Sequence, residues 1–291
     1  MSLSSQRRWS PPSPAHFAGS TIVNLVVLLF MVIWFTPIVG LFISSLRPQS
    51  AMAVSGWWTF FVEPLLTGYN FQQAIRYVGV LDSAATSLAI AIPVTVMTTL
   101  LSAIGAYALT RMNLRGRIVL SLALVVMLVI PPQVTIVPLL RLFVLVGLNG
   151  KVPAVWIYQI GFTVPFGIFL IRGFIASIPE ELFESALLDG ATVQQTFRLI
   201  VLPLCAPILA SLAILQFLWS WNDLLIPLIF LGGSQLAAPI TVEAAGIATT
   251  NGQDQTVLMA ATVLSVILPL AVVLTMQRYF VRGILGGAVK G

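Results

Sequence analysis

Charged residues are scarce in this 291-residue sequence, and cysteine and histidine are nearly absent. Asp, Glu, Lys and Arg make up only 8% of the chain, whereas a soluble domain carries about 25% charged residues. So little charge cannot cover a water-facing globule, and 58% of the residues are hydrophobic. The composition excludes a self-contained soluble enzyme and indicates an all-α membrane protein with several spans.

The single cysteine and the single histidine narrow the chemistry further. Cys205 alone can form neither a disulfide framework nor a multi-thiolate metal site. His16 lies in a stretch rich in Ser and Pro, which leaves no Ser/His/Asp triad and no histidine-based zinc centre. We therefore expect no catalytic residue and no metal ligand. The net charge of +5 does not indicate nucleic-acid binding, because in a membrane protein the distribution of Lys and Arg matters more.

Six apolar runs are long enough to cross a bilayer as helices. They lie at roughly 22–46, 84–109, 118–145, 153–176, 204–231 and 256–281. The third contains Pro131 and Pro132, so we expect a kink or a break there. The first is too long for a signal-peptide core and is expected to stay as an anchor. The chain thus divides into an N-terminal tail (1–21), a six-helix transmembrane domain (22–281) and a C-terminal tail (282–291).

The positions of Lys and Arg predict the orientation of the chain. Ten of the 14 basic residues fall on one side of the alternating loops and four on the other. Because cytoplasmic loops carry the excess of Lys and Arg, both termini are expected in the cytoplasm. The segment 47–83 is then an outer loop. Four aromatic residues close together in this loop are interpreted as a patch at the membrane interface rather than a ligand cage: Trp57, Trp58, Phe60 and Phe61.

One polar stretch between the fourth and fifth runs, 177–203, has the pattern of two short helices joined by a turn. Ser177 and Glu180 have the spacing of a capping box, which predicts that the first helix begins there. Gly190 stands where a residue in the left-handed conformation would end this helix.

A second capping box predicts the second helix, which leads into the fifth run. It is formed by Thr192 and Gln195. The first helix has an apolar side, which acidic residues flank, so that anionic lipid would repel it. This side therefore indicates either a cytoplasmic protein partner or packing on the protein's own spans. It consists of Leu182, Phe183, Ala186 and Leu187.

This stretch resembles the EAA loop of permease subunits in binding-protein-dependent ABC importers. That pattern is Glu-Ala-Ala, three residues, Gly, nine residues, Ile, one residue and Leu-Pro. Ser185 replaces the middle residue of the opening triplet. The matching positions are Glu184, Ala186, Gly190, Ile200, Leu202 and Pro203, with Asp189 and Ala191 beside the glycine.

The resemblance covers most of the chain and extends to the carbohydrate-type, maltose permease-like branch. The basic segment 278–283, the closing residues 287–291 and the triplet 221–223 are similar to that branch. Leu224 departs from it, because an aromatic residue is expected at this position.

The resemblance implies that the loop is a coupling helix seated in a separate ATPase subunit of an importer in the bacterial inner membrane. The implied partners are a second, related permease, two ABC ATPase subunits and an extracytoplasmic solute-binding protein. The sequence contains no Gly-x-x-x-x-Gly-Lys-[Ser/Thr] motif, which agrees that ATP and Mg²⁺ are bound by the partner. The implied ATPase-coupling residues are Leu182, Phe183, Glu184, Ala186, Asp189, Gly190 and Ala191.

Polar and irregular positions inside the spans are candidates for lining a solute pathway. Counting from Leu204 puts Asp223 about 28 Å along the fifth run, near the outer surface. For each candidate a structural role is also open: a packing kink, an interface anchor or a hydrogen bond between helices. The candidates are Pro131, Pro132, Trp219, Trp221, Asn222 and Asp223.

Other functions remain open on the sequence alone. A permease for a non-sugar solute would have the same features. A secondary transporter usually has ionisable residues at mid-membrane and repeated halves, and neither is evident here. A membrane scaffold would need the loop only to bind a partner.

Overall fold

The computed structural model describes residues 14–76, 79–232, 238–249 and 255–288, and these contain helices and no strand. Arg7, Arg8 and Lys290, which entered the charge count, lie outside the described residues. The long helices are α1 (Pro14–Leu46), α4 (Val80–Arg111), α7 (Val152–Ala176), α10 (Leu202–Asn222) and α13 (Gln255–Ala288). The shorter ones are α2 (Gln49–Val54), η1 (Trp57–Phe61), α3 (Tyr69–Arg76), α5 (Arg117–Val129), α6 (Pro132–Leu145), α8 (Glu180–Leu188), α9 (Val193–Thr196), η2 (Phe197–Val201), α11 (Leu225–Phe230) and α12 (Ile240–Thr249).

Five helices among the described residues are long and apolar enough to cross a membrane, and a bent pair raises the number to at most six. α4 and α7 match the second and fourth expected runs closely. α1 and α13 are longer than the runs expected from hydropathy, because α1 begins at Pro14 and α13 continues to Ala288. The expectation of an all-helical protein with several spans is therefore confirmed.

The third expected run is broken at its two prolines. α5 and α6 meet at an angle of 101°. Neither Pro131 nor Pro132 has an N–H group, so a straight helix would lose two hydrogen bonds in succession. The carbonyl of Pro132 accepts hydrogen bonds from the hydroxyls of Thr135 (2.7 Å) and Tyr158 (2.5 Å). α7 thus ties down the first turn of α6.

The fifth run differs from its expected bounds of 204–231. It begins at Val193 and continues without a break through α9, η2 and α10 to Asn222. Pro203 cannot donate to the backbone of the preceding turn, and the chain adapts with the π-helical turn η2, in which the N–H of Leu202 reaches the carbonyl of Phe197. Beyond Asn222 the chain turns and begins the separate helix α11.

The centre of the fold is the close contact between α4 and α7. Gly167 allows it, because a Cβ atom at this position would lie 2.2 Å from Oγ of Ser102. Polar side chains also join the two helices: Oγ of Ser102 donates to the carbonyl of Val164 at 3.3 Å. Small residues and hydroxyls of this kind let helices approach closely where no hydrophobic force drives them together. α10 packs on α4, α7 and α13.

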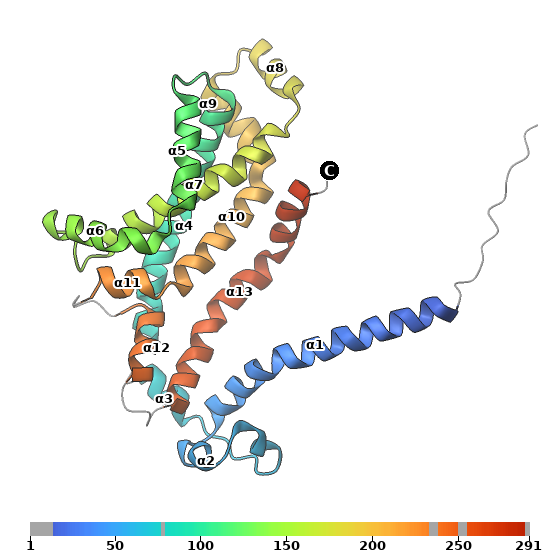
Figure 1. Cartoon of the computed structure of the whole chain (residues 1–291), viewed down its shortest axis with the longest axis vertical. Helices are drawn as coiled ribbons and strands as arrows, with labels where there is room; N and C mark the ends of the chain where they lie inside the picture. The colour runs from blue at the N-terminus through green and yellow to red at the C-terminus, as the bar shows by residue number, and fades with distance from the viewer. Residues whose placement is uncertain (1–13, 77–78, 233–237, 250–254, 289–291) are drawn as a thin grey trace, which may run out of the picture.

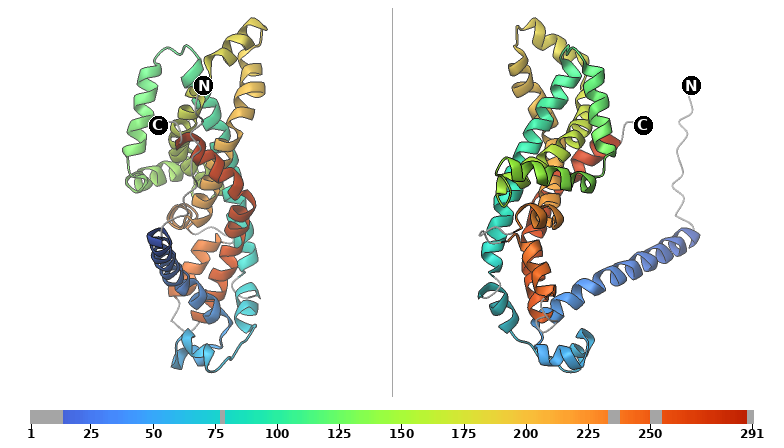
Figure 2. Two further views of the ribbon diagram at one scale, coloured as in Figure 1. Left: turned by 90° about the vertical axis from the view of Figure 1, so that its right-hand side faces the viewer. Right: turned by 60° about the vertical axis from the view of Figure 1, so that its left-hand side comes forward.

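The elongated body has a different structure at each end (Figure 1). α8 projects at one end, and α2, η1 and α3 form a compact cap at the other (Figure 2). In the cap, Arg47 is buried and donates to the carbonyl of Gly56 (2.7 Å) and to the hydroxyl of Thr59 (2.6 Å). The aromatic rings of η1 contact one another edge to face, and Trp58 and Phe61 remain exposed. This agrees with an interfacial patch.

α1 leaves the body at an angle and has few contacts with it (Figures 1 and 2). Only 6% of its most apolar stretch is buried in the chain, compared with 33% for α4 and 44% for α7. Its packing partner is α13, itself only 11% buried, together with η1 and α3. α1 therefore offers its apolar side chains to lipid or to another membrane protein.

Candidate functional site

The stretch 177–203, which we call the elbow, contains a first arm, α8, and a second arm, which consists of α9 and its continuation η2. The first arm begins at Glu180 with Pro179 as its N-cap residue. The capping box expected from Ser177 is not formed, because Oγ of Ser177 donates to the carbonyl of Phe174 in the last turn of α7 at 2.8 Å. Instead Glu180 and Glu181 place negative charge in the first turn, where the helix dipole favours it.

Gly190 ends the first arm as expected. Its φ of +74° lies in the left-handed region, which glycine enters without a Cβ penalty. The N–H of Gly190 donates to the carbonyl of Leu187 (3.0 Å), and that of Ala191 to the carbonyl of Ala186 (2.9 Å). These two bonds make a Schellman motif, which fixes the direction in which the chain leaves the helix.

The second arm begins at the predicted capping box. The N–H of Gln195 donates to Oγ1 of Thr192 (3.3 Å), and the N–H of Thr192 donates to Oε1 of Gln195 (2.8 Å). Two N–H groups without partners inside the helix are satisfied in this way. Because this arm continues into α10, its orientation is that of the fifth span.

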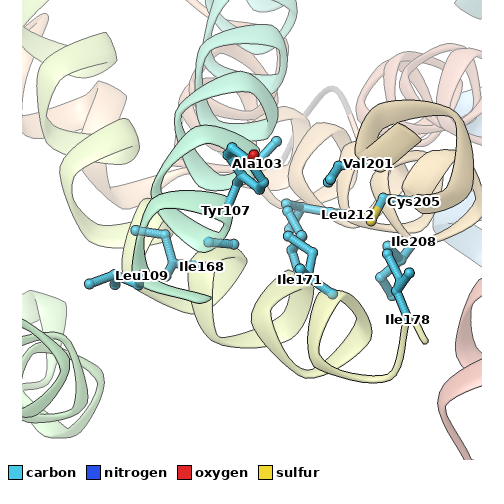
Figure 3. Packing of buried hydrophobic residues seen from close by; sticks show 12 residues of the cluster. Ala103, Tyr107, Leu109, Ile168, Ile171, Ile178, Val201, Cys205, Ile208 and Leu212 are labelled. Atoms are coloured by element: carbon cyan, nitrogen blue, oxygen red, sulfur yellow. The ribbon is translucent and has the colours of Figure 1, made fainter. Parts of the chain in front are cut away.

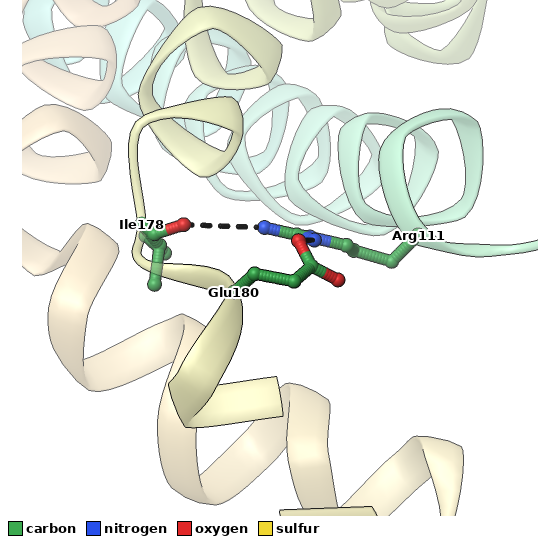
Figure 4. A network of polar contacts seen from close by, with 3 residues as sticks. All are labelled: Arg111, Ile178 and Glu180. Carbon is green, nitrogen blue, oxygen red and sulfur yellow. Dashed lines mark hydrogen bonds and ion pairs between the residues drawn. The ribbon is translucent and has the colours of Figure 1, made fainter. Parts of the chain in front are cut away.

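Arg111, the last residue of α4, holds the start of the first arm (Figure 4). Its guanidinium forms an ion pair with Glu180 and donates to the carbonyl of Ile178 at 3.3 Å. It also lies 3.7 Å from the centre of the Phe183 ring, in cation–π geometry. No local sequence pattern marks Arg111 as a contact of the elbow.

The apolar side of the first arm is divided between the chain itself and solvent. Ala186 is only 6% exposed, and Phe183 packs against a core cluster formed by α4, α7 and α10 (Figure 3). Leu182 is 42% exposed, Leu187 75% and Leu188 88%. The surface open to a partner therefore consists of these leucines, and it extends to Leu188, which the expected apolar side did not include.

The polar residues of the predicted coupling set are exposed at the elbow. Glu184, Asp189 and Gly190 are exposed, and Ala191 is half-buried. A groove lies between the two arms, with polar groups from Ser185, Asp189 and Gln195 in an otherwise mainly apolar lining. It is lined by Leu182, Ser185, Ala186, Asp189, Ala191, Gln195, Thr196, Leu199, Ile200, Pro203 and Leu204.

A second groove brings together four of the six pathway candidates. Pro132, Trp219, Asn222 and Asp223 line it with Gln133, Leu218, Leu225 and Ile226. Pro131 is not among the lining residues. Trp221 is buried, stacks on Phe217 and donates from Nε1 to the carbonyl of Ser265 at 3.2 Å. Trp221 therefore packs α10 against α13 instead of facing the groove.

Asp223 belongs to a polar network between helices. Its Oδ2 accepts a hydrogen bond from Nε2 of Gln159 (2.8 Å), whose Oε1 accepts one from Oγ of Ser220 (2.6 Å). Gln159 is seven residues into α7, about 10 Å from the start of that helix at 1.5 Å per residue. Asp223 thus contacts a residue about two turns inside α7.

The sequence alone did not identify some residues of the elbow and of the groove beside Asp223. For some of them a sequence signal exists, and for others it does not. Gln159 and Gln133 are polar residues within apolar runs, a signal that could have marked them. Tyr107 lies one turn before Arg111, and nothing in its local sequence shows that its hydroxyl reaches the second arm. Among the described residues, no three His, Cys, Asp or Glu side chains come together as a metal site requires.

Comparison with known proteins assigns the chain to a family. Residues 99–286 match the family model of the binding-protein-dependent transport system inner membrane component. The chain belongs to this family. The match includes the elbow and both grooves. The predicted resemblance to permease subunits of binding-protein-dependent importers is confirmed.

Curated relatives of this permease cover nearly its whole length. The osmoprotective compounds uptake permease protein GgtD of Synechocystis is 41% identical, over 92% of this chain and 91% of its own. The alpha-glucoside transport system permease protein AglG of Rhizobium meliloti is 31% identical, over 92% of this chain and 97% of its own. The melibiose/raffinose/stachyose import permease protein MelC of Bacillus subtilis is also 31% identical, over 95% and 99%.

A solved structure has the same fold. It is a bacterial ABC transporter involved in the import of the acidic polysaccharide alginate, and the matched chain is 23% identical with a TM-score of 0.74. The alignment covers 93% of this permease and 100% of the matched chain.

Proposed function

We propose that this permease is one of two membrane-spanning subunits of an ATP-driven importer, and that it carries a sugar or oligosaccharide delivered by an extracytoplasmic binding protein. The main support for this proposal comes from the elbow. It exposes Leu187 and Leu188 at the very end of the body, beyond the spans that could cover them. Exposed apolar residues in such a place indicate a protein partner.

The partner at the elbow is a separate ATPase subunit, which supplies ATP and Mg²⁺. This chain has no phosphate-binding loop of its own. Leu182, Leu187 and Leu188 provide the apolar seat, and Glu184 and Asp189 provide polar contacts at its edge. Phe183 and Ala186 point inward, and Gly190 and Ala191 keep the corner closed, so these four hold the arm in the shape that the ATPase contacts.

The second partner is another, related permease subunit. α1 supports this because 94% of its most apolar stretch is not buried in this chain. A span of this kind gains packing against another membrane protein. Two such subunits would enclose the solute pathway between them and rock between inward-open and outward-open states.

The orientation follows from charge. The basic residues Arg111, Arg115 and Arg117 lie near the elbow end, so we place that end, together with both termini, in the cytoplasm of an inner membrane. The cap formed by α2, η1 and α3 then faces outward, where the binding protein docks.

The groove next to Asp223 suits a hydroxylated solute. Trp219 is 48% exposed and offers part of an aromatic face, while Asn222 and Gln133 are exposed amides. Aromatic faces with a few polar groups are the usual composition of sites for small organic solutes. An osmoprotective compound is the second candidate, because of the similarity to GgtD.

Purification of the chain from its native membrane in mild detergent, with mass spectrometry of the proteins that accompany it, tests the partners. We expect a Walker-motif ATPase and a second permease. The double variant Leu187→Ser/Leu188→Ser should lose the ATPase and keep the second permease. Leu65→Ser/Leu66→Ser, which changes two exposed leucines outside the elbow, is the matched control and should keep both. Recovery of the folded chain alone would refute the proposal.

A further inference from the structure

Two residues of α4 contact the two arms of the elbow. Tyr107 and Arg111 are four residues apart and so lie on the same face of α4. Arg111 reaches the first arm, and Tyr107 reaches the second. The end of one transmembrane helix is thus in contact with both arms of the elbow.

The contact of Arg111 with the first arm consists of three interactions of one side chain. The guanidinium pairs with the Glu180 carboxylate, donates to the Ile178 carbonyl and lies over the Phe183 ring. Its side chain is only 15% exposed, whereas that of Glu180 is 64% exposed. An exposed ion pair alone contributes little, but the planar guanidinium makes all three contacts at once, which a lysine ammonium cannot do.

The contact of Tyr107 with the second arm is mainly apolar. Its hydroxyl donates to the carbonyl of Val193 at 3.3 Å, and its ring lies 5.2 Å from that of Phe197, measured between centres. Tyr107 is 7% exposed and belongs to the core cluster in Figure 3. The second arm is therefore packed on α4 as well as continuous with α10.

The first arm has few other contacts with the spans. Within the part of the chain that the structure describes, α8 has no extensive contact with any long helix, and apart from Phe183 and Ala186 its side chains are exposed. A force on α8 would therefore reach the transmembrane core through the chain on either side of it, through the packing of Phe183 and Ala186, and through Arg111.

We propose that Arg111 and Tyr107 form a clamp that makes α4 and both arms of the elbow move as one body. Arg111 is then a positioning residue through which movement of the elbow is transmitted to α4, and from α4 to α7. The inference rests on the proposed function for its role in transport, while the rigid connection itself can be tested in this chain alone.

A distance measurement tests the rigid connection. Spin labels are placed at Ile104 on α4 and Leu188 on α8, both exposed. Cys205 is 1% exposed and should not react with the label. We expect a narrow distance distribution for the parent protein, and a broad one after Arg111→Gln. Equally narrow distributions would show that Arg111 does not hold the arm. This result does not depend on any ATPase.

A transport measurement tests the role in coupling. The complex is reconstituted in vesicles, and the number of solute molecules imported per ATP hydrolysed is compared. Arg111→Gln should reduce this ratio about tenfold, which corresponds to about 1.4 kcal/mol, with the ATPase still bound. For Arg111→Lys we expect a ratio between those of the parent and of Arg111→Gln, because lysine keeps only the positive charge.

The control for this measurement is Arg115→Gln, which removes an exposed arginine that makes none of the clamp contacts and should leave the ratio unchanged. A ratio within twofold of the parent for Arg111→Gln would overturn the role in coupling. Absence of ATP-dependent uptake by the parent would refute the proposed function instead, while the distance measurement would still decide the clamp.

Discussion

Gln159 on α7 donates a hydrogen bond from Nε2 to Oδ2 of Asp223, at the end of α10, over 2.8 Å. Gln159 is 6% exposed, so its amide has little contact with water. The bond connects two spans at the edge of the groove, and its loss should change both the stability and the shape of this region.

Two substitutions of Asp223 separate the carboxylate charge from the hydrogen bond. Asp223→Ala leaves the buried amide of Gln159 without its acceptor, which should cost about 1–3 kcal/mol. Asp223→Asn keeps an acceptor oxygen in nearly the same place and should cost less. Thermal unfolding of the purified protein in detergent measures both, and equal losses of stability would show that the bond to Gln159 does not stabilise the fold.

The corner of the elbow should tolerate only residues that accept the left-handed conformation. Apart from its two chain neighbours, no atom of the described residues lies within 4 Å of a Cβ atom at Gly190, so the cost of a substitution comes from the backbone φ of +74°. Gly190→Val should cost about 1–2 kcal/mol and reduce transport, while Gly190→Asn should retain more activity. Gly173→Ala, at an equally open position inside α7, is the control and should have little effect. Equal transport by the Val and Asn variants would contradict the account.

Removal of the side-chain hydroxyl near the start of each arm should have different effects on the stability of the elbow. Thr192→Ala removes a formed capping box and should cost about 1 kcal/mol. Ser177→Ala removes a hydroxyl that caps no helix and should cost much less. Hydrogen exchange checks this at the amides of 193–196 for Thr192→Ala and at those of 180–183 for Ser177→Ala. Faster exchange is expected only at 193–196 in the Thr192 variant, and faster exchange at 180–183 in the Ser177 variant would restore the capping role first expected for Ser177.

The contact between α4 and α7 should be sensitive to a single methyl group. Gly167→Ala puts a Cβ atom 2.2 Å from Oγ of Ser102 and 2.7 Å from its Cβ. The helices must shift, and overpacking of this kind typically costs about 1–3 kcal/mol. Gly161→Ala, where no atom of another described element lies within 4 Å of the new methyl group, should be nearly neutral. The yield of folded protein and the midpoint of thermal unfolding provide the comparison. Similar values for both variants would contradict the packing described here.

Local chemistry predicted much of the elbow, and distant contacts explain the rest. Gly190 and the pair Thr192 and Gln195 act within their own turns, so the sequence pattern was sufficient. Arg111 and Glu180 are 69 positions apart, and no local pattern predicts that they meet.

The same distinction holds for the spans and the groove. Hydropathy located the apolar runs, but it could not show that a π-helical turn carries the helix past Pro203, which moved the start of the fifth span to Val193. Trp221 was a reasonable pathway candidate because of its neighbours in sequence. Only the packing of α10 on α13 shows that its ring is buried.

ATP-dependent uptake shows whether this chain works as a subunit of an ATP-driven sugar importer. The complex purified with this chain is reconstituted in vesicles that contain ATP and Mg²⁺. The binding protein and a panel of radiolabelled sugars, with osmoprotective compounds for comparison, are added outside. We expect accumulation of one class of sugar that requires both ATP and the binding protein. Accumulation by this chain alone, driven by an ion gradient without ATP, would contradict the account.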